Sequence, residues 1–229
     1  MAKVIKRIPI RLIKDMVRVG GAMPRRREFL AACMALALVV SAFPGHANEF
    51  GEGAQRFIES LANRAIAALT VPRVPRAERV TRFRALLRDH FAVKAIGQWV
   101  LGRYWRQATE AERAEFLVLF EDLIVATYVD HFARYAGGTL SVTRTVTKGT
   151  GDAIVYSQIM GRRDVPALRV TWRVRVDWRA RTGAGEYKIT DVMVEGVSMN
   201  QTKRSEFASV IRAHGGKVEG LLAELRKRV

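Results

Sequence analysis

The chain has 229 residues, of which 49% are hydrophobic and 27% charged, and 39 lysines and arginines against 22 acidic residues give a formal net charge of +17. Its single cysteine, Cys33, excludes a disulfide framework, and there is no internal repeat, low-complexity stretch or long linker. Stability must therefore come from the hydrophobic core of an ordinary folded domain.

The first 47 residues are expected to be a cleaved export signal of the twin-arginine type. The pair Arg26–Arg27 is followed by a 15-residue apolar run, Phe29–Phe43, which suits a signal sequence and is too short to span a membrane. Residues 45–47 place small side chains around one spacer, as signal peptidase requires. Cleavage is therefore expected before Asn48.

Removal of this leader changes the charge balance. Residues 48–229 keep 30 basic and 20 acidic residues, a net charge of +10, so the exported domain is still cationic. Outside the cytoplasm the available anions are lipid headgroups and acidic protein surfaces, and no nucleic-acid partner is expected. A membrane anchor is the alternative to a cleaved leader, and Met23 is the alternative to Met1 as the true start.

Helical periodicity dominates the first part of the exported domain. Apolar residues recur at helical spacing over residues 51–70 and again from Pro75, which can open a helix, to Phe91. A short helix through Ile96 is expected to stop at Gly102. The region before the sheet is therefore expected to be a series of helices.

The longest expected helix begins at Thr109 with a capping box, because Glu112 stands three residues further on. It is expected to run to Tyr135 and to end at Gly137-Gly138. Its apolar residues cover much of its circumference, whereas a surface helix shows one apolar stripe. The helix is therefore either buried on several sides or exposed on one side to a cavity, and both alternatives are open.

Residues 139–198 have the pattern of a four-stranded antiparallel meander. The third strand alternates strictly, so one face is apolar and the other is mostly basic. The apolar face packs on helices or lines a pocket, and the basic face is solvated or binds a polar partner. The two faces are Val170, Trp172, Val174, Val176 and Trp178, and Arg169, Thr171, Arg173, Arg175, Asp177 and Arg179.

Two apolar stripes separated by Gly215-Gly216 predict two further helices at the C-terminus. Helices, then a sheet, then helices is the order of an α+β fold. We therefore expect a curved four-stranded antiparallel sheet packed on several helices, in a single domain over residues 48–229.

The polar residues do not form a recognisable catalytic set. His90, His131 and His214 lack metal-ligand spacing, and Ser198 follows only the first half of a nucleophile-elbow pattern. Ser198 is expected to cap the next helix, and Asp191 is expected to be a hydrogen-bonded structural group. No enzymatic activity, metal or cofactor is therefore expected. The alternative is a hydrolase or isomerase that uses Asp191, His131 or Ser198 as its acid or base.

Several segments, in this order and spacing behind an export signal, carry a resemblance to a known family. They are Phe91 with Val100–Arg106, Arg113–Phe116 with Phe120, Thr127-Tyr128, Asp191–Met199, and Arg204–Phe207 with Gly215. The chain resembles the MlaC family of periplasmic phospholipid shuttles, also described as toluene-tolerance or Ttg proteins. The resemblance covers roughly Phe57–Leu225.

The resemblance implies a cone-like α+β fold with a deep apolar pocket for acyl chains and no catalysis. It implies a monomeric periplasmic carrier whose partners are an inner-membrane ABC transporter complex and an outer-membrane lipoprotein–porin complex. Ala92 and Glu112 depart from the family pattern, and one branch of the family accompanies hopanoid synthesis, so a hopanoid is an alternative ligand. A periplasmic adaptor without cargo is a second alternative.

The expected pocket walls are the apolar strand face and the helix sides opposite it. They are Val100, Trp105, Phe116, Phe120, Ile124, Tyr128, Phe132, Phe207 and Ile211 from the helices, and Tyr156, Val170, Trp172, Val174, Val192 and Val194 from the sheet. Pockets and cores share their composition, so each of these residues is also a candidate for plain core. The basic face, formed by Arg169, Arg173, Arg175 and Arg179, is expected to dock on acidic partner surfaces.

Overall fold

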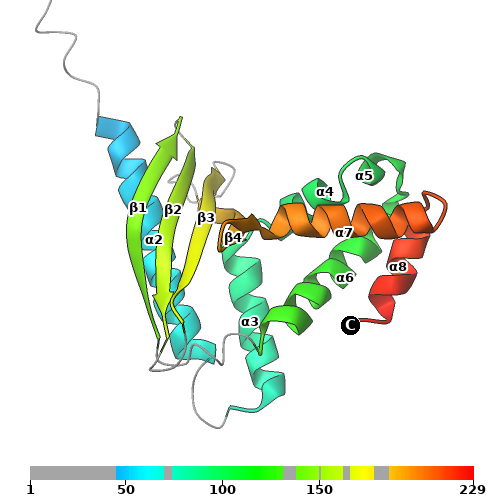
Figure 1. Ribbon diagram of the computed structural model, residues 1–229, viewed down its shortest axis with the longest axis horizontal. Coiled ribbons are helices and arrows are strands. Elements are labelled where there is room, and N and C mark those ends of the chain that lie inside the picture. The colour runs from blue at the N-terminus through cyan, green and yellow to red at the C-terminus, as the bar shows by residue number, and fades with distance from the viewer. Residues whose placement is uncertain (1–44, 70–73, 131–137, 150, 162–165, 178–185) are drawn as a thin grey trace, which may run out of the picture. The chain divides into compact units, whose positions relative to one another are not determined.

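The computed structural model describes residues 45–69, 74–130, 138–149, 151–161, 166–177 and 186–229 (Figure 1). All the elements described below belong to one unit, Pro44–Val229. The expectations for residues 1–44, and for His131, Phe132, Trp178 and Arg179, lie outside the described residues.

Along the chain, helices come before and after the strands of the sheet, which is the order expected for the α+β fold. The helices before it are α2 (Gly45–Leu69), α3 (Arg76–His90), α4 (Val93–Leu101), α5 (Tyr104–Gln107) and α6 (Glu110–Tyr128). The strands are β1 (Thr139–Lys148), β2 (Asp152–Met160), β3 (Leu168–Asp177), β4 (Glu186–Val194) and β5 (Val197–Ser198). The helices after it are α7 (Met199–Ala213) and α8 (Val218–Arg226).

Helix α6 begins as the sequence predicts. The Thr109 hydroxyl accepts a hydrogen bond from the Glu112 backbone amide at 3.2 Å, and the Glu112 carboxylate accepts one from the Thr109 amide at 2.8 Å. This reciprocal capping box satisfies two of the unpaired amides of the first turn. The described helix ends at Tyr128, and the expected continuation to Tyr135 falls mostly outside the described residues.

The described strands form one antiparallel sheet in the order β1-β2-β3-β4-β5. The fold class was predicted correctly, but the sheet has a fifth strand that the sequence analysis did not separate. Strands β4 and β5 are joined by Glu195-Gly196, whose φ values are 49° and 83°. Positive φ at both central residues is the requirement of a type I′ hairpin turn, and Val194 pairs with Val197 across it.

One face of the sheet is covered by α2, which Figure 1 shows along the length of the sheet. The contact is close because α2 carries small residues there: a side chain added at Gly53 would overlap the Tyr187 ring, and one at Gly51 would meet Thr147 at 3.0 Å. Val155 of β2 and Val174 of β3, which lie on this face, are fully buried. The strict alternation of β3 therefore has its expected consequence, with its valines under a helix.

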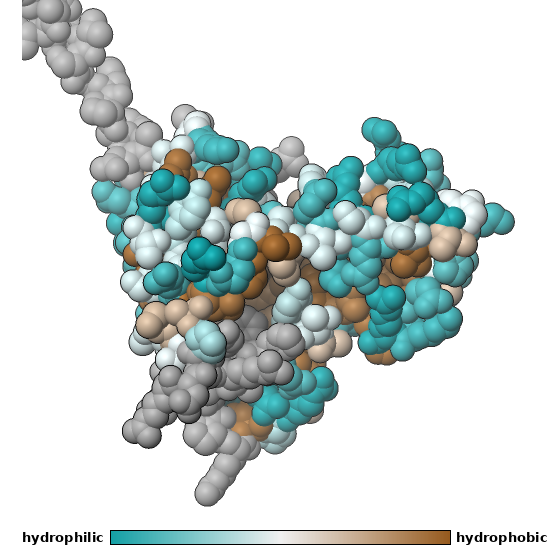
Figure 2. Space-filling model, in the orientation of Figure 1, coloured by the Kyte–Doolittle hydropathy of each residue, from teal (hydrophilic) through white to brown (hydrophobic). Residues whose placement is uncertain are grey.

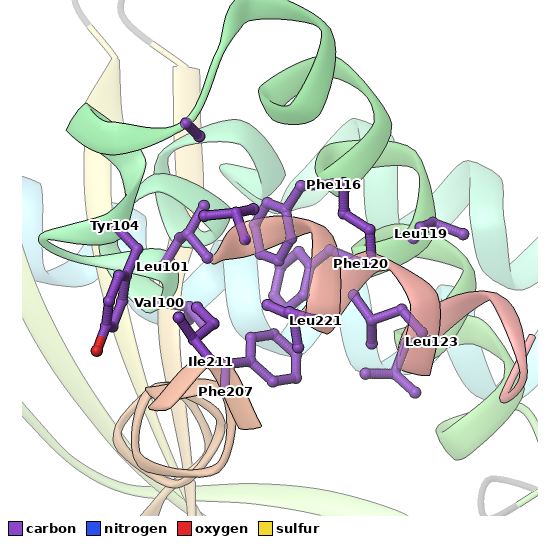
Figure 3. Close-up of a cluster of buried hydrophobic side chains, with 14 of the residues drawn as sticks. Val100, Leu101, Tyr104, Phe116, Leu119, Phe120, Leu123, Phe207, Ile211 and Leu221 are labelled. Carbon is purple, nitrogen blue, oxygen red and sulfur yellow. The ribbon is translucent and has the colours of Figure 1, made fainter. Parts of the chain in front are cut away.

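Three groups of buried side chains form the core. The sheet cluster is Phe50, Ala54, Ile58, Leu61, Ala153, Val155, Val174, Val176 and Ile189. The central cluster is Leu69, Phe83, Leu87, Val125 and Val129. The helical cluster, part of which Figure 3 shows, is Ile96, Val100, Leu101, Tyr104, Ala108, Phe116, Leu119, Phe120, Leu123, Phe207, Ile211, Val218, Leu221, Leu222 and Leu225.

None of the helices in the described part of the chain combines the length and the apolar content that crossing a bilayer requires.

Candidate functional site

The three core clusters meet at Phe91. This residue ends α3 in an extended conformation, with φ −113° and ψ 145°, and it forms an isolated parallel bridge with Ile189 of β4. The next amide, that of Ala92, donates to the Ile189 carbonyl at 2.9 Å. These backbone contacts fasten the α3–α4 connection to the sheet, and the Phe91 ring packs against all three clusters.

Half-buried apolar side chains lie between and beside the three clusters, with Tyr128 against the central cluster and Trp172 and Val192 against the sheet cluster. Leu86 packs against both the sheet and central clusters, and Val93 and Ile124 pack against both the central and helical clusters. We call the set formed by Leu86, Phe91, Val93, Ile124, Tyr128, Trp172 and Val192 the apolar junction. Figure 2 shows hydrophobic residues in the hollow between the sheet and the helices α6 and α7.

The polar atoms of the Trp172 and Tyr128 side chains have hydrogen-bond partners beside the apolar junction. The Trp172 indole Nε1 donates to the Ser157 hydroxyl at 2.9 Å, and that hydroxyl donates to the Val170 carbonyl at 2.9 Å. The Tyr128 hydroxyl reaches the Met199 sulfur at 3.4 Å, which links the end of α6 to the start of α7. Both rings therefore offer apolar surface while their polar ends are engaged, as buried Tyr and Trp usually require.

Five of the helix residues selected from the sequence lie instead in the packed interior of the helical cluster. Val100, Phe116, Phe120, Phe207 and Ile211 are each 2% exposed or less. Phe116 and Phe120 stack with ring centroids 5.6 Å apart, and Phe207 meets both rings edge-on at 5.9 and 6.2 Å. Figure 3 shows these side chains converging between the helices.

The remaining apolar candidates are distributed over several environments. Val170 and Val174 are buried in the sheet, and Val194 is half-buried and pairs with Val170. Trp105 lies half-buried at the surface of the helical cluster, where the Arg113 guanidinium stands 5.5 Å over its ring and donates to its carbonyl. Ile124, Tyr128, Trp172 and Val192 are the predicted residues that belong to the apolar junction.

Tyr156 does not lie on the apolar face of the sheet, where it was expected to line the pocket. It pairs with Thr171, whereas the neighbouring Val155 pairs with Trp172, so Tyr156 lies on the face opposite to the sheet cluster. The Arg144 guanidinium stands 4.4 Å from the centre of its ring. The reason is the period of two in a strand, which sends adjacent side chains to opposite faces.

The arginines of β3 are in part already neutralised by neighbouring carboxylates. Arg169 forms a salt bridge with Glu195 at 2.8 Å, and its backbone amide also donates to that carboxylate. The hydrogen bonds from the Arg169 backbone and side chain lower the pKa of Glu195. Arg175 pairs with Asp152 at 2.7 Å. Arg173 is exposed and has no carboxylate partner among the described residues.

Two of the three groups named for an enzyme, Ser198 and Asp191, take part in a helix cap, and the third, His131, lies outside the described residues. Ser198 is the N-cap of α7: its hydroxyl accepts from the Gln201 amide at 3.1 Å and donates to Asp191 at 2.8 Å. The second Asp191 oxygen accepts from the Asn200 amide at 3.3 Å. Both side chains are therefore engaged in holding the end of β4 to the start of α7, which confirms the structural roles predicted for them.

A cavity of about 260 Å³ lies among α3, α4 and α6, and Val93 of the apolar junction is one of its lining residues. It is lined by Arg84, Arg88, Val93, Lys94, Leu117, Val118 and Glu121. Burial alone would raise the pKa of Glu121, but hydrogen bonds from Arg88 and Arg84 outweigh burial and hold that pKa below its ordinary value. This cavity is smaller than most ligand pockets, and its lining combines charged side chains with a mostly apolar accessible surface. No group of three metal-ligating side chains occurs among the described residues.

Sequence reasoning placed Phe91 and Leu86 outside the site, although both belong to the apolar junction. A signal for Phe91 was present in the chain. It is the last residue of the helical apolar stripe, and a second helix starts only two residues later. Its position at the end of this stripe, directly before the next helix, indicates a residue where two helices meet.

Comparison with known proteins identifies related chains. The family model described as MlaC protein matches residues 59–227. The intermembrane phospholipid transport system binding protein MlaC of Haemophilus influenzae is 21% identical over 132 residues, 57% of this chain, and the match spans only 59% of that relative's length. The phospholipid-binding protein of Ralstonia solanacearum, solved in complex with a phospholipid, matches with a TM-score of 0.65 and 22% identity over 76% of this chain and 96% of its own. The structural match shows the fold.

Proposed function

The chain belongs to the MlaC family, and from this premise we propose that it is a lipid carrier that holds the acyl chains of a phospholipid at the apolar junction. One observation carries the proposal. Around Phe91, side chains of α3, α6, β3 and β4 remain half-buried, whereas the clusters on each side are packed. Half-buried apolar surface where several elements converge is the usual character of a site for an apolar ligand.

The energetics of such a site need no specific headgroup contact. Each methylene removed from water contributes about 0.8 kcal/mol, so ten buried methylenes contribute about 8 kcal/mol before the costs of association. A protein that only binds and releases lipid also needs no acid, base or nucleophile, in agreement with the capping roles of Ser198 and Asp191.

We assign the pocket walls to Ile124, Tyr128, Trp172 and Val192 together with Phe91. The buried residues of the helical cluster then support the wall from behind. Val93 and Ile124 connect the two, because they pack against both the helical and the central clusters. In this arrangement the long helix α6 is buried on one side and borders the ligand on another, so both alternatives raised by its wide apolar surface apply to it.

The same proposal includes the compartment and the partners. The first 47 residues act as the export signal, and residues 48–229 work in the periplasm with a membrane transporter complex on each side. The relative from Haemophilus influenzae carries a name that describes an intermembrane phospholipid transport system, which supports this setting. Arg173, exposed on the outer face of β3, is the arginine of that strand best placed to meet an acidic partner surface.

Native mass spectrometry with lipid extraction tests the proposal on the chain purified from the periplasm after expression with its own leader. We expect a one-to-one adduct with the mass of a phospholipid. An adduct with the mass of a polycyclic triterpenoid would replace phospholipid by hopanoid as the cargo. An unmodified protein mass that persists after incubation with phospholipid vesicles would refute the carrier function and favour an adaptor.

A pair of substitutions on α6 locates the site. Ile124→Trp fills the apolar junction with a larger side chain, so the lipid adduct should be lost while the far-ultraviolet circular dichroism of the protein is kept. Ala126→Trp is the matched control, because Ala126 is exposed on the same helix, and it should retain the adduct. Equal lipid occupancy in both variants would place the ligand elsewhere.

A further inference from the structure

An aromatic and basic surface lies where α4 packs against α7. Trp99 of α4 is 44% exposed, an unusual position for the largest side chain in a protein. The Arg204 guanidinium of α7 stands 4.7 Å from the centre of its ring and donates to its carbonyl at 2.9 Å. A side chain added at Gly102 would lie 3.0 Å from the same guanidinium, so this glycine leaves space for the arginine.

The charged side chains of the segment that carries Trp99 are all basic. The segment Val93–Gln107 contains Lys94, Arg103 and Arg106 and no acidic residue. All three cations are exposed. The one acidic residue of α7, Glu206, is already paired with Lys203 and with Arg228. Lys94 lines the cavity toward α3 and α6, so we call Trp99, Arg103, Arg106 and Arg204 the Trp99 surface.

We propose that the Trp99 surface docks the protein on an anionic phospholipid bilayer. An exposed indole with the Arg204 guanidinium over its ring, and with Arg103 and Arg106 nearby in the chain, can bind without a partner of complementary shape. The interfacial layer of a bilayer takes the indole, as Trp is enriched at this depth in membrane proteins, and lipid phosphates take the arginines. Each basic residue near an anionic bilayer adds about 1 kcal/mol of attraction. An acidic protein patch is the competing partner.

The Trp99 surface lies close to the proposed lipid site. Both helices that carry it begin at the proposed lipid site: Val93 at the start of α4 belongs to the apolar junction, and Met199 at the start of α7 contacts Tyr128. At a rise of 1.5 Å per residue, Trp99 lies about 9 Å along α4 and Arg204 about 8 Å along α7 from those residues. A bilayer held there stands within one lipid length of the junction.

Vesicle cosedimentation of the full processed protein tests the docking. We expect binding to vesicles of phosphatidylcholine with phosphatidylglycerol, weaker binding at high salt, and little binding to phosphatidylcholine alone. Arg103→Glu with Arg106→Glu should weaken the partition coefficient at least about 25-fold, since each lost cation costs about fivefold. The control Arg56→Glu with Arg64→Glu makes the same charge change on α2 and should weaken binding far less.

The aromatic contribution has its own matched pair. Trp99→Ala should weaken vesicle binding several-fold, and Met160→Ala, which removes a comparably exposed apolar side chain from β2, should leave it unchanged. The docking proposal is overturned if the Arg103 and Arg106 variant binds anionic vesicles as tightly as the Arg56 and Arg64 variant, or if only an acidic protein partner is bound through this surface. The bilayer docking and the lipid adduct are measured separately, so either can fail without the other.

Discussion

Phe207→Ala distinguishes packed core from ligand wall in the helical cluster. Phe207 is 1% exposed, and its ring meets Phe116 at 5.9 Å and Phe120 at 6.2 Å, nearly perpendicular to both. Truncation of a fully buried phenylalanine costs about 3–5 kcal/mol, and edge-to-face ring pairs place this site at the upper part of that range. A loss of this size is a large share of a total stability of about 5–15 kcal/mol.

The assay is thermal unfolding combined with lipid occupancy. For a domain of this length, 1 kcal/mol changes Tm by about 2–4 °C, so Phe207→Ala should lower Tm by roughly 6–20 °C. Because the residue does not border the apolar junction, the folded fraction at low temperature should keep its lipid adduct. Ile124→Ala is the comparison variant. Because Ile124 is half-buried, this substitution should lower the stability less than Phe207→Ala does and should lower the lipid occupancy more.

The opposite pattern would refute the reasoning. If Phe207→Ala unfolds within about 2 °C of the wild type and loses its lipid, then the space beside Phe207 belongs to the ligand rather than to the core. The three-ring contact would in that case be a wall that opens to admit an acyl chain.

Three smaller perturbations follow from the same contacts. Thr109→Ala removes the capping box of α6 and should cost about 1 kcal/mol in chemical denaturation, whereas Thr109→Ser should keep most of it. The pKa of Glu121 is lowered because hydrogen bonds from Arg88 and Arg84 outweigh its burial. Its contribution to the free energy of unfolding is therefore present above the ordinary carboxylate pKa of 4.5 and is lost as the pH falls through the lowered pKa of the folded state. Glu121→Gln should remove that part of the acid dependence of stability. Burial lowers the pKa of His90, so the unfolded chain binds the proton more readily and stability should decline as the pH falls below about 6.5. The measurement is the free energy of unfolding as a function of pH. Equal slopes for His90→Gln and the wild type between neutral pH and about 5 would contradict this expectation.

Local features were predictable from the sequence because each depends on a few neighbouring residues. The capping box at Thr109, the helix end at Gly102 and the N-cap at Ser198 occur where the sequence places them. The alternation of β3 also assigned its faces correctly, because the period of two is a property of the strand itself. The family was recognisable for the same reason, since its motifs are short local segments in a constant order.

The location of the apolar junction required the tertiary structure. Phe116 and Ile124 belong to one apolar helix, yet Phe116 is fully buried against Phe207 and Ile124 is half-buried between two clusters. Their sequence environments are alike, and only the packing of α6 against α3, α4, α7 and α8 separates them. The same holds for the arginines of β3, where Arg169 is paired and Arg173 has no carboxylate partner in the described part of the chain.

By itself, the sequence determined most of the helices and strands, the fold class and the family of this protein. It could not separate a core from a ligand site, because both are apolar and both satisfy the same helical and strand periodicity. That distinction depends on which surfaces are left incompletely covered when the elements pack. Packing of elements distant in the chain, such as Phe91 against Ile189, decided it.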